Sequence, residues 1–84
     1  MYTVYILKSK VKERYYIGST GNLDDRIVRH NQGRNKSTKA HRPWNVALTE
    51  NYKTKKEALK RERKIKSYKG GEAFKKIIQN AGVV

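Results

Sequence analysis

The chain has 84 residues, of which 21 are Lys or Arg and 7 are Asp or Glu, so its formal net charge at neutral pH is +14. Self-repulsion of that size favours a polyanionic partner, and nucleic acid fits better than an anionic membrane surface, because Lys and Arg that neutralise phosphates release counterions. The absence of cysteine excludes disulfides and thiolate metal sites. No apolar run reaches the length of a membrane span and no signal peptide is recognisable, so we expect a cytoplasmic protein without a membrane partner.

The N-terminal quarter predicts a β-hairpin. Residues 2–7 (YTVYIL) and 14–20 (RYYIGST) are rich in β-branched and aromatic residues, which favour strands. The charged stretch KSKVKER connects them and has about the length of an irregular hairpin loop. We therefore expect these two strands to pair antiparallel.

A helix is predicted from Asn22 to about Gln32. Asn is a good N-cap, and two aspartates follow in the first turn, where the helix dipole favours anions. Gly33 provides the C-terminal stop. The next stretch, residues 33–43 (GRNKSTKAHRP), is polar, basic and without periodicity, so we expect a loop.

The second half predicts one strand and two helices. Residues 44–52 (WNVALTENY) alternate in polarity, with Trp44, Val46, Leu48 and Glu50 on one side. Thr54 and Glu57 match the capping box and predict a helix that runs to about Tyr68. After a Gly-Gly break, apolar residues at helical spacing predict a last amphipathic helix through Ala73, Phe74, Ile77, Ile78 and Ala81. The expected fold is α+β, in the order β-β-α-β-α-α, with a small three-stranded, mainly antiparallel sheet flanked by helices.

Glu62 is predicted to lie on the buried arc of its helix. At about 100° per residue and with Ala58 at 0°, Ile65 falls at about −20° and Glu62 at about 40°. A carboxylate in that position costs desolvation free energy unless it is paired or bound to a metal. The sequence leaves open whether Glu62 forms a structural ion pair, for example with Lys66 four residues on, or holds a metal ion.

The first helix is predicted to place a histidine and an arginine beside an apolar stripe. With Leu23 at 0°, His30 falls at about −20° and Arg26 at about −60°. A histidine on an apolar face is more often a hydrogen-bonded core residue than a catalyst, and an arginine beside it is more often a surface residue. Neither residue by itself indicates a function.

The hairpin carries a tyrosine pair. Tyr5 and Tyr16 are either ordinary strand aromatics or part of a site. In an antiparallel pair, the residue numbers of two directly opposed residues have a constant sum. Tyr5 and Tyr16 share a face if this sum is odd, as it is when the two tyrosines oppose each other directly. Gly18 then lies on the same face and leaves room for a group to approach the sheet.

Together these residue types suit phosphodiester hydrolysis. One carboxylate plus waters is a usual way to hold Mg²⁺, and arginine stabilises charge on phosphate oxygens. A tyrosine or a histidine can take a proton from water.

The same residues resemble the GIY-YIG nuclease superfamily. The half-motifs are Thr3-Val4-Tyr5, with Thr where the motif name has Gly, and Tyr16-Ile17-Gly18. The following GST, the arginine and histidine four residues apart, and the stretch EALKRERKIK are also similar to the family pattern. The resemblance covers nearly the whole chain and is closest to the small stand-alone bacterial branch, which has similar HRPW and ALKRE.KIK stretches. It implies one GIY-YIG-like domain over residues 1–84.

The resemblance also implies residue roles. Glu62 would hold one Mg²⁺ or Mn²⁺, and Arg26 would stabilise the charge on the phosphate. Tyr5 would activate or orient the water, assisted by His30, and Tyr16 would position water or phosphate. Because a free tyrosine has a pKa of about 10, Tyr5 would need nearby cations to serve as a base at neutral pH. Gly18 would be structural. Further candidates are a family asparagine at Asn80 and, as nucleic-acid contacts, Lys36, Lys39, His41, Arg42 and Lys66.

Three function classes explain the charge. The leading expectation is a monomeric, metal-dependent endonuclease that acts on DNA rather than RNA with little sequence specificity. The alternatives are a non-catalytic nucleic-acid-binding module and a small basic structural protein associated with RNA. Neither alternative needs Glu62 on an apolar face together with Tyr5, Tyr16 and Arg26.

Overall fold

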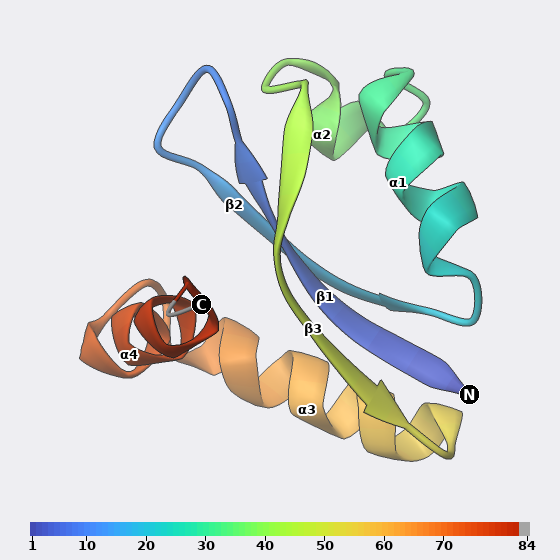
Figure 1. Ribbon diagram of the computed structural model, residues 1–84, viewed down its shortest axis with the longest axis vertical. Helices are drawn as coiled ribbons and strands as arrows, with labels where there is room; N and C mark the ends of the chain where they lie inside the picture. The colour runs from blue at the N-terminus through green and yellow to red at the C-terminus, as the bar shows by residue number, and fades with distance from the viewer. Residues whose placement is uncertain (83–84) are drawn as a thin grey trace.

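Three strands form one antiparallel sheet in the computed structural model, which describes residues 1–82 except for the side chains of residues 37 and 80–82. The strands are β1 (Tyr2–Ser9), β2 (Tyr15–Thr20) and β3 (Trp44–Tyr52), and the spatial order is β2-β1-β3. The helices are α1 (Leu23–Asn31), α2 (Lys36–Lys39), α3 (Lys55–Ser67) and α4 (Glu72–Gly82) (Figure 1). The predicted α+β class is confirmed, and β3 proves to be antiparallel to β1.

The predicted helix starts are confirmed. The Asn22 side chain accepts a hydrogen bond from the Asp25 backbone N–H at 3.1 Å. The Thr54 hydroxyl accepts from the Glu57 backbone N–H at 3.2 Å and donates to the Glu57 carboxylate at 3.0 Å. Each cap satisfies a donor that the first helical turn would otherwise leave without a partner. Among the described residues, no helix has the length and apolar character needed to cross a bilayer.

Alternation along β1 divides the core into two clusters. Val4 and Ile6 point to the side of α3 and α4, where they pack with buried residues of those helices. Tyr5 and Leu7 point to the other side, where they pack with Trp44 and with α1. In Figure 1, α1 and α2 accordingly lie on one side of the sheet, and α3 and α4 on the other.

The expectation that Trp44, Val46, Leu48 and Glu50 lie on one side of β3 is wrong. Leu48 pairs with Ile6, but the next pair toward the start of β3 is Val46 with Leu7, so β3 contains one extra residue, Ala47. Such a bulge exchanges the two faces of a strand. Leu48 therefore packs on the α3 side, while Trp44 packs on the α1 side.

Residues 33–43 are not only a loop, as was expected, because α2 forms one helical turn within them. This turn is stabilised by hydrogen bonds from the backbone N–H groups of Thr38 and Lys39 to the Asn35 carbonyl. In α4, Phe74 is buried as predicted, but Ala73 is exposed, and the side chain of Ala81 lies outside the described part of the chain.

A two-point ion pair fixes α3 on the sheet. The Arg61 guanidinium donates to both oxygens of Glu50 on β3, at 2.8 and 3.2 Å. This hydrogen bonding lowers the pKa of the Glu50 carboxyl. The pair joins α3 to β3 at the residue that precedes Glu62 along the helix.

Candidate active site

A cavity of about 350 Å³ opens beside the edge strand β2. Four elements form its walls: β1, β2, α1 and α3. Five of the residues singled out from the sequence line it, namely Tyr5, Tyr16, Gly18, Arg26 and Glu62. We refer to it below as the site cavity.

The two tyrosines reach the site cavity from one face of the hairpin. Tyr5 pairs with Gly18, so the numbers of opposed residues sum to an odd value and Tyr16 shares the face of Tyr5. The parity prediction is thus confirmed, although Tyr5 lies opposite Gly18 and diagonal to Tyr16. The two ring centroids are 6.2 Å apart. Tyr5 is fully buried and forms the floor of the cavity, and Tyr16 is half-buried.

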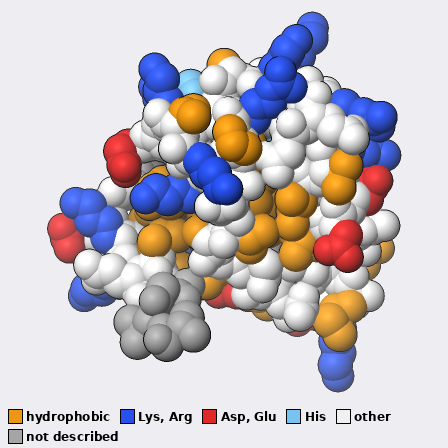
Figure 2. Space-filling view, turned by 45° about the horizontal axis from the view of Figure 1, so that its top comes forward, with side chains coloured by type: hydrophobic (Ala, Val, Ile, Leu, Met, Phe, Trp, Pro, Cys, Tyr) orange, Lys and Arg blue, Asp and Glu red, His pale blue; other side chains and the backbone are white. Residues whose placement is uncertain are grey.

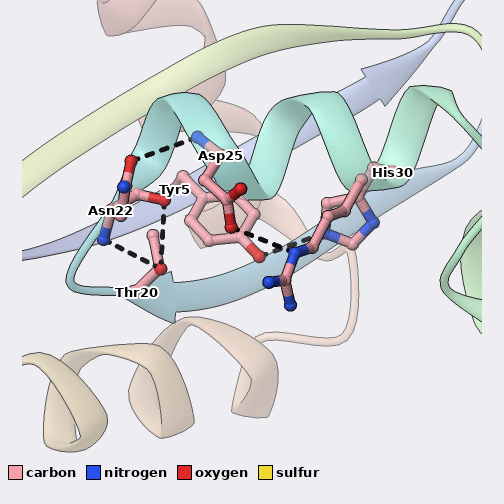
Figure 3. Close-up of polar contacts among 6 residues, drawn as sticks. Tyr5, Thr20, Asn22, Asp25 and His30 are labelled. Carbon is pink, nitrogen blue, oxygen red and sulfur yellow. Dashed lines mark hydrogen bonds and ion pairs between the residues drawn. The ribbon is translucent and has the colours of Figure 1, made fainter.

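His30 lies behind Tyr5 and does not line the cavity. Its Nε2 is 3.1 Å from the Tyr5 hydroxyl, and Figure 3 shows this contact beneath α1. Its Nδ1 is 2.8 Å from the Thr38 hydroxyl, and its side chain has no exposed surface. Burial, together with the charge of Arg26, lowers the pKa of His30, so the imidazole is neutral at neutral pH. Any contribution of His30 to chemistry in the cavity must therefore pass through Tyr5.

The cations near Tyr5 do not bring its pKa down to neutral pH in the protein alone. Burial, with the neighbouring Tyr16, raises the pKa of Tyr5 to about 12. The Arg26 guanidinium acts in the opposite direction and lowers this pKa, but the net shift is upward. Tyr5 is consequently a protonated phenol at neutral pH.

Glu62 enters the site cavity from α3. Its Oε1 accepts from the Ser19 hydroxyl at 2.6 Å, and its Oε2 accepts from Lys66 Nζ at 2.7 Å. The structural alternative considered for Glu62, an ion pair with Lys66, is therefore present. Ser19 alternates with Gly18 along β2 and points to the opposite face, so the cavity extends around the edge of this strand.

A single carboxylate fits a divalent cation of the Mg²⁺ type. Within residues 1–82, no three His, Cys, Asp or Glu side chains are grouped so as to form a multi-ligand metal site. Mg²⁺, however, is commonly held by one or two carboxylates together with waters and substrate phosphates. The Glu62 side chain is 16% exposed and the Lys66 side chain is 52% exposed. Because the Lys66 side chain is half-exposed, its ammonium can move away from Glu62 and leave Oε2 free to bind a cation.

Positive charge continues from the site cavity along α1. Arg26 also lines a second cavity of about 420 Å³ with Arg29, Arg34 and Asn35. The Arg34 backbone N–H donates to the Arg29 carbonyl at 3.0 Å, and Arg29 is paired with Asp25 at 3.0 Å. Figure 2 shows Lys and Arg side chains projecting from several parts of one face of the molecule, with Asp and Glu side chains toward its left and right edges.

The other predicted nucleic-acid contacts lie outside the site cavity. Lys36 and Lys39 are exposed on α2. Arg42 is exposed and its guanidinium lies against Gly33, where a Cβ would collide with it. The ring of His41 is half-buried and contacts Trp44 edge-on, at 6.4 Å between centroids. The fifth candidate is Lys66, which is paired with Glu62. Asn80 lies in α4, but its side chain is outside the described residues.

Sequence reasoning missed Ser19 and Thr38, which hydrogen-bond to the candidate residues Glu62 and His30. Ser19 has a detectable signal, because the motif residues Tyr16 and Gly18 fix the face of β2 and leave Ser19 pointing toward α3. Thr38 has none, because it lies in a polar stretch without periodicity, and only the tertiary structure places it against His30.

Comparison with known proteins agrees with this geometry. The family model of the GIY-YIG catalytic domain matches residues 1–75. The chain belongs to the GIY-YIG family. This GIY-YIG domain is 40% identical over 75 residues to a UPF0213 protein of Staphylococcus epidermidis, covering 88% of this chain and 90% of that protein. It is 42% identical over 66 residues to a UPF0213 protein of Staphylococcus aureus, covering 77% and 79%.

The fold is also similar to a solved structure. The solution NMR structure of the UPF0213 protein BH0048 from Bacillus halodurans superposes on this GIY-YIG domain with a TM-score of 0.61. The match covers 99% of this chain and 89% of that one at 28% identity. The family prediction is thus confirmed, and the domain has a nuclease-like fold in common with small stand-alone relatives.

Proposed function

We propose that this GIY-YIG domain is a divalent-metal-dependent endonuclease that hydrolyses phosphodiester bonds in DNA with little sequence specificity. The observation that supports it most strongly is the site cavity, whose lining includes Tyr5, Tyr16, Arg26 and Glu62. A non-catalytic binding module or a structural protein associated with RNA would need the positive charge but not this combination of groups.

Arg26 and Tyr16 act on the phosphate. Arg26 donates to the non-bridging oxygens and stabilises the negative charge that grows on them as the nucleophile attacks. Tyr16, the more exposed of the two phenols, positions the phosphate or the attacking water by its hydroxyl. Arg29 and Arg34 extend the positive surface from Arg26, which suits a neighbouring phosphate of the same strand.

Tyr5 and His30 form a proton relay. With its pKa at about 12, Tyr5 cannot serve as a preformed phenolate at neutral pH. It can accept a proton from water while its own proton passes to His30 Nε2, which is 3.1 Å away. The water oxygen then bonds to phosphorus, the bond to the leaving oxygen breaks, and that oxygen takes a proton from solvent. His30 returns to its neutral form by the reverse path through Tyr5.

Glu62 is the residue that would hold the metal ion. When bound there, Mg²⁺ or Mn²⁺ would act as a Lewis acid toward the phosphate and the leaving oxygen. Ser19 keeps Oε1 of Glu62 directed into the cavity by its hydrogen bond, and Lys66 neutralises the carboxylate in the absence of a cation.

The substrate class follows from the charge and from the lining of the cavity. The groups identified in it suit phosphate oxygens rather than base edges, which is consistent with low sequence specificity. DNA in preference to RNA, a monomeric state and a cytoplasmic location are part of the same proposal.

The direct test is cleavage of supercoiled plasmid and of single-stranded DNA by the purified protein. We expect nicked circles and shortened single strands with Mg²⁺ or Mn²⁺ and intact DNA with EDTA. Tight binding without cleavage under either ion would support the non-catalytic module. Cleavage that persists in EDTA would contradict the assigned role of Glu62.

A further inference from the structure

Thr38 is a buried residue to which the proposed function gives no part. It lies in α2 and has no exposed surface. Its hydroxyl is 2.8 Å from His30 Nδ1, and its carbonyl accepts a hydrogen bond from Trp44 Nε1 at 3.0 Å. The indole thus anchors α2 to the start of β3, and α2 holds the Thr38 hydroxyl against the back of His30.

A neutral imidazole carries one N–H, so the chain Thr38–His30–Tyr5 has two possible proton arrangements. In the first, His30 Nδ1–H donates to Thr38, and Nε2 accepts the Tyr5 proton. In the second, Thr38 donates to Nδ1, and Nε2–H donates to the Tyr5 oxygen. In the first arrangement, lone pairs of the Tyr5 oxygen face the cavity. In the second arrangement, the Tyr5 O–H faces the cavity.

The surroundings favour the first arrangement. Arg26 lines the same cavity as Tyr5, and its guanidinium can only donate hydrogen bonds. Toward Arg26 the Tyr5 oxygen can therefore act only as an acceptor, which leaves its own proton for His30. In the second arrangement, Arg26 and Nε2–H would both donate to Tyr5. At the other end, the Thr38 hydroxyl can donate to the Asn35 carbonyl, although this contact is long at 3.4 Å. In the first arrangement all three protons therefore have protein acceptors.

We propose that Thr38 is a positioning residue that holds His30 as the Nδ1–H tautomer, so that Tyr5 presents a lone pair rather than a proton to the site cavity. The catalytic consequence rests on the proposed function, because only a Tyr5 oxygen in this state can take a proton from water. The tautomer itself can be measured without any cleavage.

The experiment is a long-range ¹H–¹⁵N correlation spectrum of the histidine side chains, recorded at about pH 8, where the imidazole is neutral. A His41→Gln variant identifies the His30 signals, because the chain has only two histidines. We expect His30 in the Nδ1–H form in the wild type and in Thr38→Ser, which keeps the hydroxyl. We expect Thr38→Val, which keeps the shape without the hydroxyl, to lose this preference.

An Nε2–H tautomer in the wild type would overturn the proposal, and so would an unchanged Nδ1–H tautomer in folded Thr38→Val. If Thr38→Val fails to fold, the wild-type and Thr38→Ser spectra still decide. Cleavage provides the second readout: we expect about a hundredfold loss in Thr38→Val and recovery of most activity in Thr38→Ser. A wild type that cleaves no DNA would instead contradict the proposed function, while the spectra would still test the tautomer.

Discussion

Tyr5 lies directly opposite Gly18 across the β1–β2 pair, and its hydroxyl occupies the space that a side chain at position 18 would need. A Cβ built at position 18 would be 2.6 Å from the Tyr5 oxygen and 3.1 Å from the ring of Tyr16. The glycine of the second half-motif is therefore a requirement of packing. It allows two phenols on one face of the hairpin to share the floor and wall of one cavity.

Gly18→Ala should displace Tyr5. The new methyl group must push the phenol away from its position, because contacts shorter than about 3 Å are repulsive for carbon. Overpacking of this kind costs about 1–3 kcal/mol of unfolding free energy, which corresponds to a fall in melting temperature of about 4–8 °C per kcal/mol in a domain of this size. We expect cleavage to fall about a hundredfold as well, because the Tyr5 hydroxyl loses its alignment.

Gly21→Ala is the matched control for stability. A Cβ there would lie 3.6 Å from its nearest neighbour, a ring carbon of Tyr2, which is an ordinary contact. Its melting temperature should stay within about 2 °C of the wild type, as for most surface substitutions. Equal melting temperatures for the wild type and Gly18→Ala would contradict the close packing of Tyr5.

Stability should decrease as the pH falls below about 6.5. Burial lowers the pKa of His30 in the folded protein, whereas in the unfolded chain the imidazole titrates near its ordinary value. Below that value the unfolded state binds a proton that the folded state does not, so the free energy of unfolding falls, by at most about 1.4 kcal/mol per pH unit from this group. Above it, this contribution is constant.

Urea denaturation between about pH 5.5 and 8 measures this effect. A His30→Gln variant should lose the part of the slope that comes from this imidazole, whereas His41→Gln should keep it. Identical slopes for the wild type and His30→Gln would show that His30 is not held neutral by the fold.

DNA binding should weaken steeply with salt. Each phosphate that the protein neutralises on duplex DNA contributes about −0.9 to the slope of log K against log salt. Residues 51–69, with nine Lys or Arg and two Glu, and residues 33–43 are the segments that we expect to contribute. The double variant Arg29→Gln/Arg34→Gln should reduce the slope by about 1 for each phosphate contact that is lost.

The comparison variant is Lys75→Gln/Lys76→Gln on α4, which removes the same charge away from the site cavity. It should change the slope less than Arg29→Gln/Arg34→Gln does. Equal effects of the two double variants would indicate that the DNA binds elsewhere on the protein surface. A flat salt dependence of the wild type would show that the charge does not serve phosphates at all.

Much of the fold was predictable because local rules decided it. Asn22 and Thr54 begin helices by capping chemistry that depends on neighbouring residues alone. The helical wheel placed Glu62 beside Ala58 and Ile65, and both apolar residues are buried. Tyr5 and Tyr16 lie on one face whenever the numbers of opposed residues sum to an odd value. Their shared face could therefore be predicted without knowing which residue lies opposite Tyr5.

What could not be predicted depends on distant contacts. The bulge at Ala47 arises where β3 changes register on β1, and no local signal in WNVALTENY marks it. The α2 turn is polar, and its position depends on the bond between Trp44 and Thr38. The raised pKa of Tyr5 could not be foreseen either, because composition suggests abundant cations around it, whereas the burial that outweighs them is a property of the folded chain.

Glu62→Gln is the variant that separates metal binding by Glu62 from a purely structural role of this residue. Glutamine keeps the size of the side chain and its bond from Ser19, but it removes the charge. Because Lys66 is half-exposed, losing this ion pair should cost only about 0.5 kcal/mol, so the melting temperature should change little. Glu57→Gln is the matched control, since glutamine can also serve in a capping box.

The decisive measurement is metal-dependent nicking of supercoiled plasmid, with melting temperature and metal-free DNA binding recorded on the same preparations. For Glu62→Gln we predict a loss of cleavage of about a hundredfold or more, with near wild-type melting and with DNA binding that is unchanged or slightly tighter. Glu57→Gln should cleave almost as well as the wild type. A Glu62→Gln protein that is well folded and cleaves at the wild-type rate would contradict the account, and one that loses activity only by unfolding early would show that Glu62 serves structure alone.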